Sequence, residues 1–330
     1  MREKIKYETS KKICSVFLTV LLLLSIPVTS VPVSAATKIP PIDAKITTKN
    51  VQNLLEKYDP DGAYILEKQM KAGSDILVWF SHGSRILDSV EIAVHEETHG
   101  YSFNYARNFG ETAYFVGNKK TIYVPYTKVY KSKKMAASIP KRLRTFRYDT
   151  YVSKPSAGLS ANVDGVYGLM DEFMAYRAGM NVSVSLFPYL ESENADWDTW
   201  QVYINSCENG RQAYAEFKYY ILHYLYYAKK HHADIYRGII NNQAFCRAYK
   251  KLESSYAKLI RTYTGDLEKL EDILEKPGYT LEISDDSVVL EDEGGGTGVG
   301  RYTEEYEALT KECEKKRYQS IHNILIKRGE

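Results

Sequence analysis

Apolar positions along the chain recur mostly every three or four residues, the spacing that places them on one face of a helix. Continuous apolar runs, and short runs around a glycine-containing loop, instead predict strands. In the first half of the chain these patterns predict helices at residues 50–58 and 64–72, a buried strand at 75–80, and a hairpin of strands at 113–116 and 121–124.

A predicted helix over residues 88–99 has an apolar side and a polar side. Val90 and Val94 fall opposite His95 and His99 on a helical wheel. We therefore expect the apolar side to pack against the core and the two histidines to face a cleft.

Residues at both ends of this helix indicate where it begins and ends. Asp88, with Glu91 three positions later, is a candidate for a capping box at its start. Gly100 follows His99 directly, and glycine costs about 1 kcal/mol inside a helix. The helix is therefore expected to end there or to be carried onward by tertiary contacts.

A second helix with a distinctive face is predicted over residues 169–179. Glu172, Ala175, Tyr176 and Gly179 recur at helical spacing and share one side. Two of these residues are small, so another helix can approach closely. A carboxylate on this face can therefore meet the His95 and His99 pair.

The remaining patterns predict a mainly helical second half. A long loop is expected at 148–168, since Ser, Gly and Asn are frequent there. Gly294–Gly300 lacks the Lys-Ser/Thr ending of a phosphate-binding loop and is expected to be a flexible connector. The other expected elements are helices at 197–204, 212–232, 235–262, 265–275 and 303–327, and a small hairpin at 279–283 and 287–290.

The first 36 residues have the pattern of a secretory signal peptide. A basic start is followed by an apolar run from Ile13 to Ile26 and by small residues ending at Ala36. The apolar run is short for a membrane span, so an uncleaved anchor is the less favoured alternative. The mature protein is therefore expected outside the cell, either free or retained at the cell envelope, with no stable membrane span.

Charge and cysteine content exclude some classes of protein. Of 44 basic and 42 acidic residues, five and two lie before residue 37, so the mature chain carries a formal charge of about −1. No nucleic-acid partner is implied. A basic stretch at 128–147 is expected to be a solvated face rather than an anion-docking site. Cys207, Cys246 and Cys313 are too few and too widely spaced for a disulfide framework, and we expect them to be buried.

The sequence His95-Glu96-Glu97-Thr98-His99 contains the candidate metal ligands and a candidate catalytic base. Histidines four apart on a helix present two imidazole nitrogens to a single ion. Glu96 lies about 100° around the helix from His95, where it can reach a water bound to that ion. His-Glu-x-x-His arises by chance in only about one chain in a hundred of this length, so the motif favours a metal site with a general base.

This motif, followed by Glu172 in Asp171-Glu-Phe-Met-Ala-Tyr176, resembles the zincin metallopeptidases of the gluzincin group. The short spacing, the Glu-x-x-Ala pattern and a tyrosine shortly before the glutamate are most similar to anthrax lethal factor and the secreted Pro-Pro endopeptidases. The resemblance covers roughly residues 75–180. It implies an α+β fold, with a zincin-like catalytic domain at 37–185 that contains a small sheet and the active-site helix. A mainly helical region follows at 186–330.

The resemblance also implies roles for individual residues. His95, His99 and Glu172 would bind Zn²⁺, and Glu96 would act as the base. Asp171 competes with Glu172 as the third ligand, but it points about 100° away. The family's tyrosine corresponds to Tyr167, which would donate to the oxyanion; its rivals are Tyr148, Tyr151 and Tyr176. Three other histidines, His223, His231 and His232, lack a metal spacing.

These features predict a secreted zinc-dependent metallopeptidase that hydrolyses a protein or peptide substrate outside the cell. Two alternatives stay open. One is a non-catalytic, zinc-stabilised binding module or adhesin, which has no use for Glu96. The other is a metal-dependent hydrolase of cell-wall amides, which uses the same chemistry on another substrate.

Overall fold

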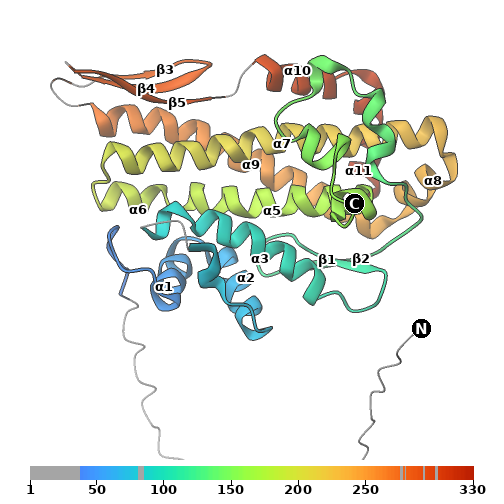
Figure 1. Cartoon of the computed structure of the whole chain (residues 1–330), viewed down its shortest axis with the longest axis horizontal. Helices are drawn as coiled ribbons and strands as arrows, with labels where there is room; N and C mark the ends of the chain where they lie inside the picture. Colours follow the sequence, from blue (N-terminus) through green and yellow to red (C-terminus); the bar gives the residue numbers. More distant parts are fainter. Residues whose placement is uncertain (1–37, 81–84, 276–277, 279, 293, 302–303) are drawn as a thin grey trace, which may run out of the picture. The chain divides into compact units, whose positions relative to one another are not determined.

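Three long helices form the centre of the described structure (Figure 1). They are α5 (Val166–Ser185), α7 (Trp197–His231) and α9 (Gln243–Leu274), and each packs against the other two. The computed structural model describes residues 38–80, 85–275, 278, 280–292, 294–301 and 304–330, so the expected signal peptide lies outside the described residues. Residues 38–330 form one compact unit, in which α5 of the expected catalytic region packs on α7 of the expected helical region.

The helix with the histidine motif is α3 (Val90–Asn104), and it packs against α5 as the sequence predicted. Val90 and Val94 are buried, whereas Ile92, on the other side, is 45% exposed. A methyl group at Gly179 of α5 would lie 2.9 Å from Glu91 Oε1. The small residue is therefore what lets the two helices approach closely.

Two predictions about the first eighty residues are corrected. The second predicted helix begins earlier than residue 64, because α1 (Thr48–Tyr58) is separated from α2 (Pro60–Lys71) by Asp59 alone, with proline in the first turn of α2. The expected strand at 75–80 is instead a 3₁₀ turn, Ile76–Phe80. Val78 in this run is 55% exposed, so the apolar run does not mark a buried strand.

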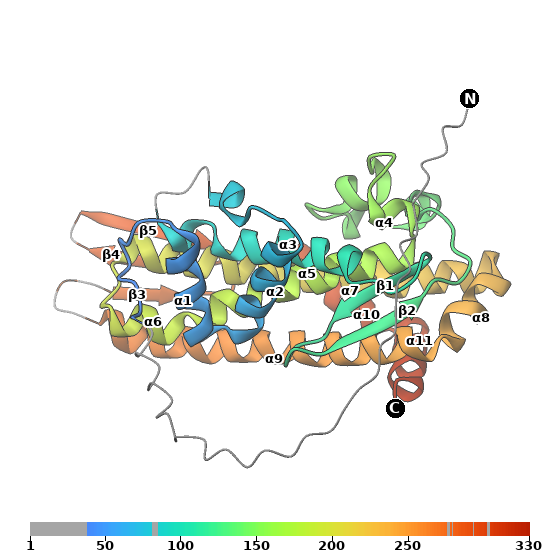
Figure 2. The same cartoon turned by 90° about the horizontal axis from the view of Figure 1, so that it is seen from below.

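The predicted hairpin is present as β1 (Glu111–Phe115) and β2 (Thr121–Pro125), which pair antiparallel with Glu111 opposite Pro125. β1 lies beside α3 and β2 beside α9 (Figure 2). Gly117, Asn118 and Lys119 all have positive φ in its turn, and Asp61 accepts hydrogen bonds from the backbone N–H groups of Asn118 and Lys119.

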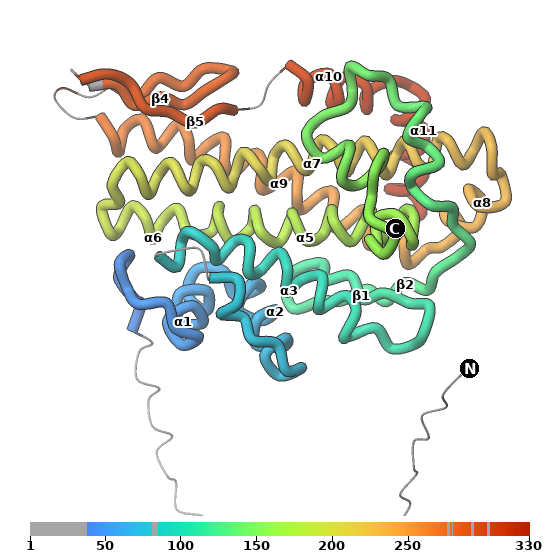
Figure 3. The backbone as a smooth tube through the Cα atoms, in the orientation of Figure 1, coloured from blue at the N-terminus to red at the C-terminus, as the bar shows by residue number. Residues whose placement is uncertain are grey.

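The expected long loop at 148–168 contains helical structure. A π-type turn covers Asp149–Ser153, α4 covers Ser160–Val163, and α5 already begins at Val166. After α5, the short helix α6 (Phe187–Ser192) leads into α7 (Figure 3). The expected gap between helices at 197–204 and 212–232 is absent, because α7 is one continuous helix. It is followed by α8 (Ala233–Asn241).

The glycine-rich segment is a strand rather than a flexible connector. β3 (Thr280–Ile283), β4 (Ser287–Asp292) and β5 (Gly295–Gly300) form an antiparallel sheet in that order. Trp197 Nε1 donates a hydrogen bond to Thr297 Oγ1 at 2.7 Å, which ties β5 to α7. The expected last helix is divided into α10 (Glu304–Cys313) and α11 (Lys316–Arg328). The α+β assignment is confirmed, with the described residues mainly helical and both sheets small.

The basic stretch at 128–147 is solvated except at its end. Most of its lysines and arginines are exposed, but Arg147 is buried and forms an ion pair with Glu216 of α7 at 2.7 Å. Tyrosines of α7 such as Tyr220 and Tyr224 lie in the core, as expected for a tyrosine-rich helix.

The three cysteines after residue 37 are buried, as predicted, and all three are free. Among the helices of the described residues, none combines the length and the apolar character that a membrane span requires.

Candidate metal centre

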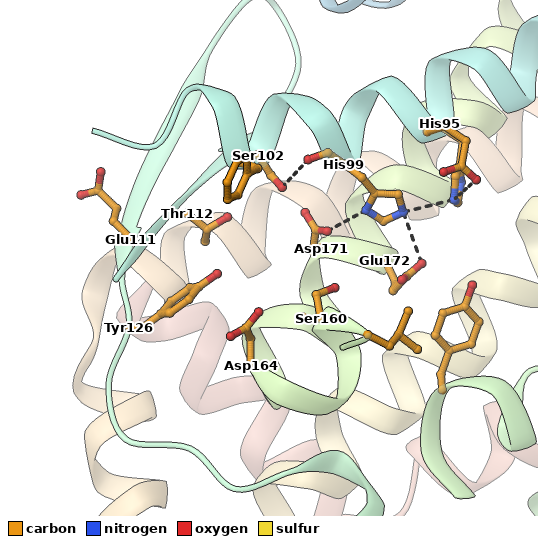
Figure 4. Close-up of a pocket in the computed structure, with 15 residues that line it drawn as sticks. His95, His99, Ser102, Glu111, Thr112, Tyr126, Ser160, Asp164, Asp171 and Glu172 are labelled. Atoms are coloured by element: carbon orange, nitrogen blue, oxygen red, sulfur yellow. Dashed lines mark hydrogen bonds and ion pairs between the residues drawn. The ribbon is translucent and has the colours of Figure 1, made fainter. Parts of the chain in front are cut away.

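Helices α3 and α5 bring three possible metal ligands together (Figure 4). His99 Nε2 lies 3.3 Å from His95 Nε2 and 3.4 Å from Glu172 Oε2, and the three donor atoms all lie within 4.8 Å of one another. His95 and Glu172 are buried and His99 is partly exposed. The structure therefore assembles the predicted ligand set.

The donor atoms fit a zinc ion in kind and in spacing. Imidazole nitrogen and carboxylate oxygen bind zinc at about 2.0–2.2 Å, so neighbouring ligands of a tetrahedral ion stand about 3.3–3.5 Å apart. The two distances from His99 Nε2 match that spacing. Three protein ligands also leave one position for water or substrate, the arrangement of catalytic zinc sites.

Asp171 is the hydrogen-bond partner of a ligand rather than a ligand. Its Oδ2 lies 2.6 Å from His99 Nδ1, on the ring edge opposite the nitrogen that faces His95. Burial alone would lower the pKa of His99, but the carboxylates of Asp171 and Glu172 raise it well above its usual value. With one proton held on Nδ1 by Asp171, a metal ion would have to displace only the proton on Nε2.

Replacing the two neighbouring acids separates these roles. We expect Glu172→Ala to abolish stoichiometric zinc binding, because a ligand is lost. Asp171→Asn should lower zinc affinity only about 10- to 100-fold, the usual cost of losing the partner of a ligating histidine. Competition with a chromophoric chelator measures both, and equal affinities in the two variants would contradict the assignment.

His95 is oriented by packing rather than by a carboxylate. The Tyr176 ring lies edge-on to the His95 ring, with centroids 4.4 Å apart, and the Arg147 guanidinium lies 4.6 Å from the centre of the same tyrosine ring. Burial, followed by the charges of His99 and Arg147, lowers the pKa of His95 to about 3. The imidazole is therefore neutral at physiological pH, as a ligand must be.

Glu96 and Glu97 are adjacent but differ in their surroundings. Glu96 lines the cleft, with Oε1 4.0 Å from His95 Nε2, and its pKa is raised chiefly by burial. Glu97 is buried on the other side of α3 and accepts hydrogen bonds from Trp79 Nε1 at 2.8 Å and Ser74 Oγ at 2.5 Å. Glu96 is thus the carboxylate available to the site, and Glu97 holds the helix in place.

The α3 helix continues through Gly100 to Asn104 because of a tertiary contact. A methyl group at Gly100 would lie 2.0 Å from Gln69 Nε2, and that amide donates to the Glu97 carbonyl at 3.0 Å. The expected capping box at the start of α3 is wrong. The helix begins after Ser89, with no side-chain cap, and Asp88 instead accepts from the Arg85 backbone N–H.

The ligand triad opens into a cleft of about 420 Å³. The cleft runs along α3 from the histidines to Ser102 and Phe103, and β1, α4 and α5 supply its other walls. Glu111, Tyr126 and Asp164 lie at the end away from His95 (Figure 4). A chain segment can therefore reach the metal position from solvent.

The structure does not place Tyr167 in this cleft. Its ring is buried, and its hydroxyl interacts with Thr127 Oγ1 at 2.8 Å and accepts from the amide of Asn242. The first turn of α5 begins earlier than expected and turns this side chain toward α9 and β2. Tyr148 is also engaged elsewhere, since its hydroxyl donates to the Ala136 carbonyl.

Of the four candidate tyrosines, Tyr151 is the one that lines the cleft. Its hydroxyl lies 3.4 Å from that of Tyr176, and its ring packs against Phe217. Burial, followed by the charge of Glu172, raises the pKa of Tyr151 far above its usual value. The phenol is therefore protonated at neutral pH and close to the metal ligands.

His82 is not among the described residues. The remaining histidines of the chain do not line the site. His223 is buried in the core, with Nε2 2.8 Å from Ser138 Oγ and Nδ1 2.8 Å from Tyr318 Oη. Each ring nitrogen of His223 has a hydrogen-bond partner, so a structural role in the core explains this histidine.

We therefore expect the triple replacement of His223, His231 and His232 by Gln to leave the zinc content of folded protein unchanged. Metal analysis after size-exclusion chromatography measures it. A lower stoichiometry would mean that one of these residues holds a second ion.

Two kinds of site residue were not identified from the sequence. Asp171 was considered only as a rival ligand, although a carboxylate beside a ligand is a candidate partner for a ligating histidine. Glu111 and Asp164 show no local pattern, because only tertiary packing brings β1 and α4 to the same cleft. No family model matches the chain, and no curated protein and no solved structure shows significant similarity to it.

Proposed function

We propose that this protein is a secreted zinc-dependent metallopeptidase. The main support for the proposal is the convergence of His95, His99 and Glu172, whose donor atoms lie within 4.8 Å of one another. Glu96 stands beside them in an open cleft. The likeness of the two motifs to gluzincins supports the same reading.

A zinc ion held by these residues would supply a water of pKa near 7 and polarise a peptide carbonyl. Glu96 accepts the proton of the attacking water and passes it to the leaving amine. Asp171 keeps the proton of His99 on Nδ1. The Tyr151 hydroxyl donates to the oxygen that gains negative charge.

The cleft argues against a purely structural ion. Structural zinc sites are closed by four protein ligands, whereas the described residues offer three here and border a space large enough for a peptide segment. A hydrolase of cell-wall amides would need the same base and ligands, so substrate choice separates it from a peptidase.

Hydrolysis by residues 37–330 with one equivalent of zinc tests the proposal. A mixed peptide library and purified cell-wall material are incubated with the protein, with and without a zinc chelator, and products are identified by mass spectrometry. We expect peptide cleavage that stops with chelator and returns with added zinc. Release of cell-wall fragments alone would favour the amide hydrolase, and no product from either substrate would contradict catalysis.

A further inference from the structure

We propose that the end of the cleft formed by Glu111, Asp164 and Tyr126 is a subsite for a lysine or arginine side chain of the substrate. This inference rests on the proposed function, because it specifies the peptide that the metal centre would cleave. It concerns residues that are neither ligands nor the base.

Apart from the two histidines, the charged side chains that line the cleft are all carboxylates. Five carboxylates face it, those of Glu96, Glu111, Asp164, Asp171 and Glu172, and no lysine or arginine is among its described lining residues. A zinc ion would balance the ligand Glu172 and the base Glu96. The other three carboxylates would still carry negative charge that only a ligand can offset.

In the part of the chain that the structure describes, no basic side chain forms an ion pair with Glu111 or Asp164. Arg107 is the nearest in sequence to Glu111, but its guanidinium stacks on the Tyr123 ring at 3.4 Å, and only its backbone N–H reaches Glu111 Oε1. Burial and then the charge of Asp171 raise the pKa of Asp164, and no cation lowers it. The acidic end is therefore electrostatically uncompensated.

An unsatisfied buried acceptor points into the same space. Asp171 is 8% exposed and lines the cleft, and its Oδ1 has no hydrogen-bond partner among the described residues, while Oδ2 is occupied by His99. A buried carboxylate oxygen without a donor is costly. A cation bound at this end of the cleft would offset the negative charge of this carboxylate.

Aromatic side chains flank the acidic end. Phe103 is 83% exposed and Tyr126 is 37% exposed, and both line the cleft. The Tyr126 ring is fixed by stacking on Tyr167, with centroids 4.8 Å apart. Such rings pack against the aliphatic stem of lysine or arginine and attract the charged head. The combination of carboxylates and open rings suits a long cationic side chain better than a small ion.

A binding experiment tests the subsite without relying on turnover. The zinc-loaded Glu96→Gln chain, residues 37–330, is titrated into fluorescent peptides that differ only by lysine or norleucine at one of six scanned positions. We expect the lysine peptide to bind about tenfold more tightly at one position, as two half-buried carboxylates would provide. Glu111→Gln combined with Asp164→Asn in this background should reduce the ratio to about twofold, with each single change intermediate.

Asp234→Asn is the matched control. It removes the same charge from an exposed residue of α8 outside the cleft and should leave the lysine preference unchanged. Equal binding of lysine and norleucine at every position, or a preference that survives the double change, would overturn the subsite. Hydrolysis by the unmodified chain is measured separately. Cleavage without a lysine preference rejects only the subsite, and a lysine preference without cleavage rejects only the peptidase.

Discussion

Glu96→Gln is expected to lower hydrolysis by roughly three orders of magnitude or more, while the protein keeps about one zinc ion per chain. Glutamine preserves the size and polarity of the side chain but cannot accept a proton. The three ligands are untouched, because Glu96 Oε1 lies 4.0 Å from the nearest ligand nitrogen. Turnover of a cleaved reporter peptide and metal analysis of the same sample decide the outcome together.

Glu97→Gln provides the matched control, because it makes the same chemical change one residue along α3. Its carboxylate bonds to Trp79 and Ser74 rather than facing the cleft. We expect a loss of stability of about 1–2 kcal/mol, seen as a lower melting temperature, with turnover retained. Full activity of Glu96→Gln, or equal loss in both variants, would remove Glu96 as the base.

The parts of the fold that the sequence predicted are those with strong local periodicity. The amphipathic helix through His95, the small-residue face of α5 and the hairpin around Gly117 are present. Short apolar runs were less informative. Residues 76–80 form a 3₁₀ turn that packs on α3, where Trp79 Nε1 donates to Glu97 in the middle of the helix.

The glycine-rich strand β5 is the opposite case, a strand that the local sequence pattern does not predict. Glycine has low strand propensity, so Gly295–Gly300 carries no local signal for a strand. Pairing with β4 and the bond between Trp197 and Thr297 determine its conformation. The pairing with β4 is local, but the bond from Trp197 joins residues 100 positions apart in the sequence, which a local pattern does not contain.

Some residues of the candidate site could be predicted from the sequence and others could not. The proximity of His95 and His99 could be predicted from spacing alone, since a helix fixes their relation, and that of Glu172 from its helical face. The tyrosine could not, because its position depends on how residues 148–165 pack. That segment contains two helical turns, so Tyr167 belongs to α5 and faces Thr127, while Tyr151 reaches the cleft.

Tyr151→Phe is expected to lower kcat by about 10²- to 10³-fold, or about 3 to 4 kcal/mol in the activation free energy, with zinc retained. The phenol is the neutral donor on the cleft side of the ligands, and burial together with the charge of Glu172 keeps it protonated. Its hydroxyl would strengthen its hydrogen bond as negative charge develops on the carbonyl oxygen. The change should therefore affect kcat more than KM.

Tyr167→Phe serves as the comparison, because it removes a buried hydroxyl of the same kind that bonds to Thr127 and Asn242 instead. It should cost about 1 kcal/mol of stability and leave kcat unchanged within about twofold. Steady-state kinetics on one reporter peptide, with zinc content measured in parallel, distinguishes the two tyrosines. An unchanged kcat in Tyr151→Phe would leave Tyr176, whose hydroxyl lies 3.4 Å away, as the donor to replace next, and a large loss in Tyr167→Phe would mean that α5 moves when substrate binds.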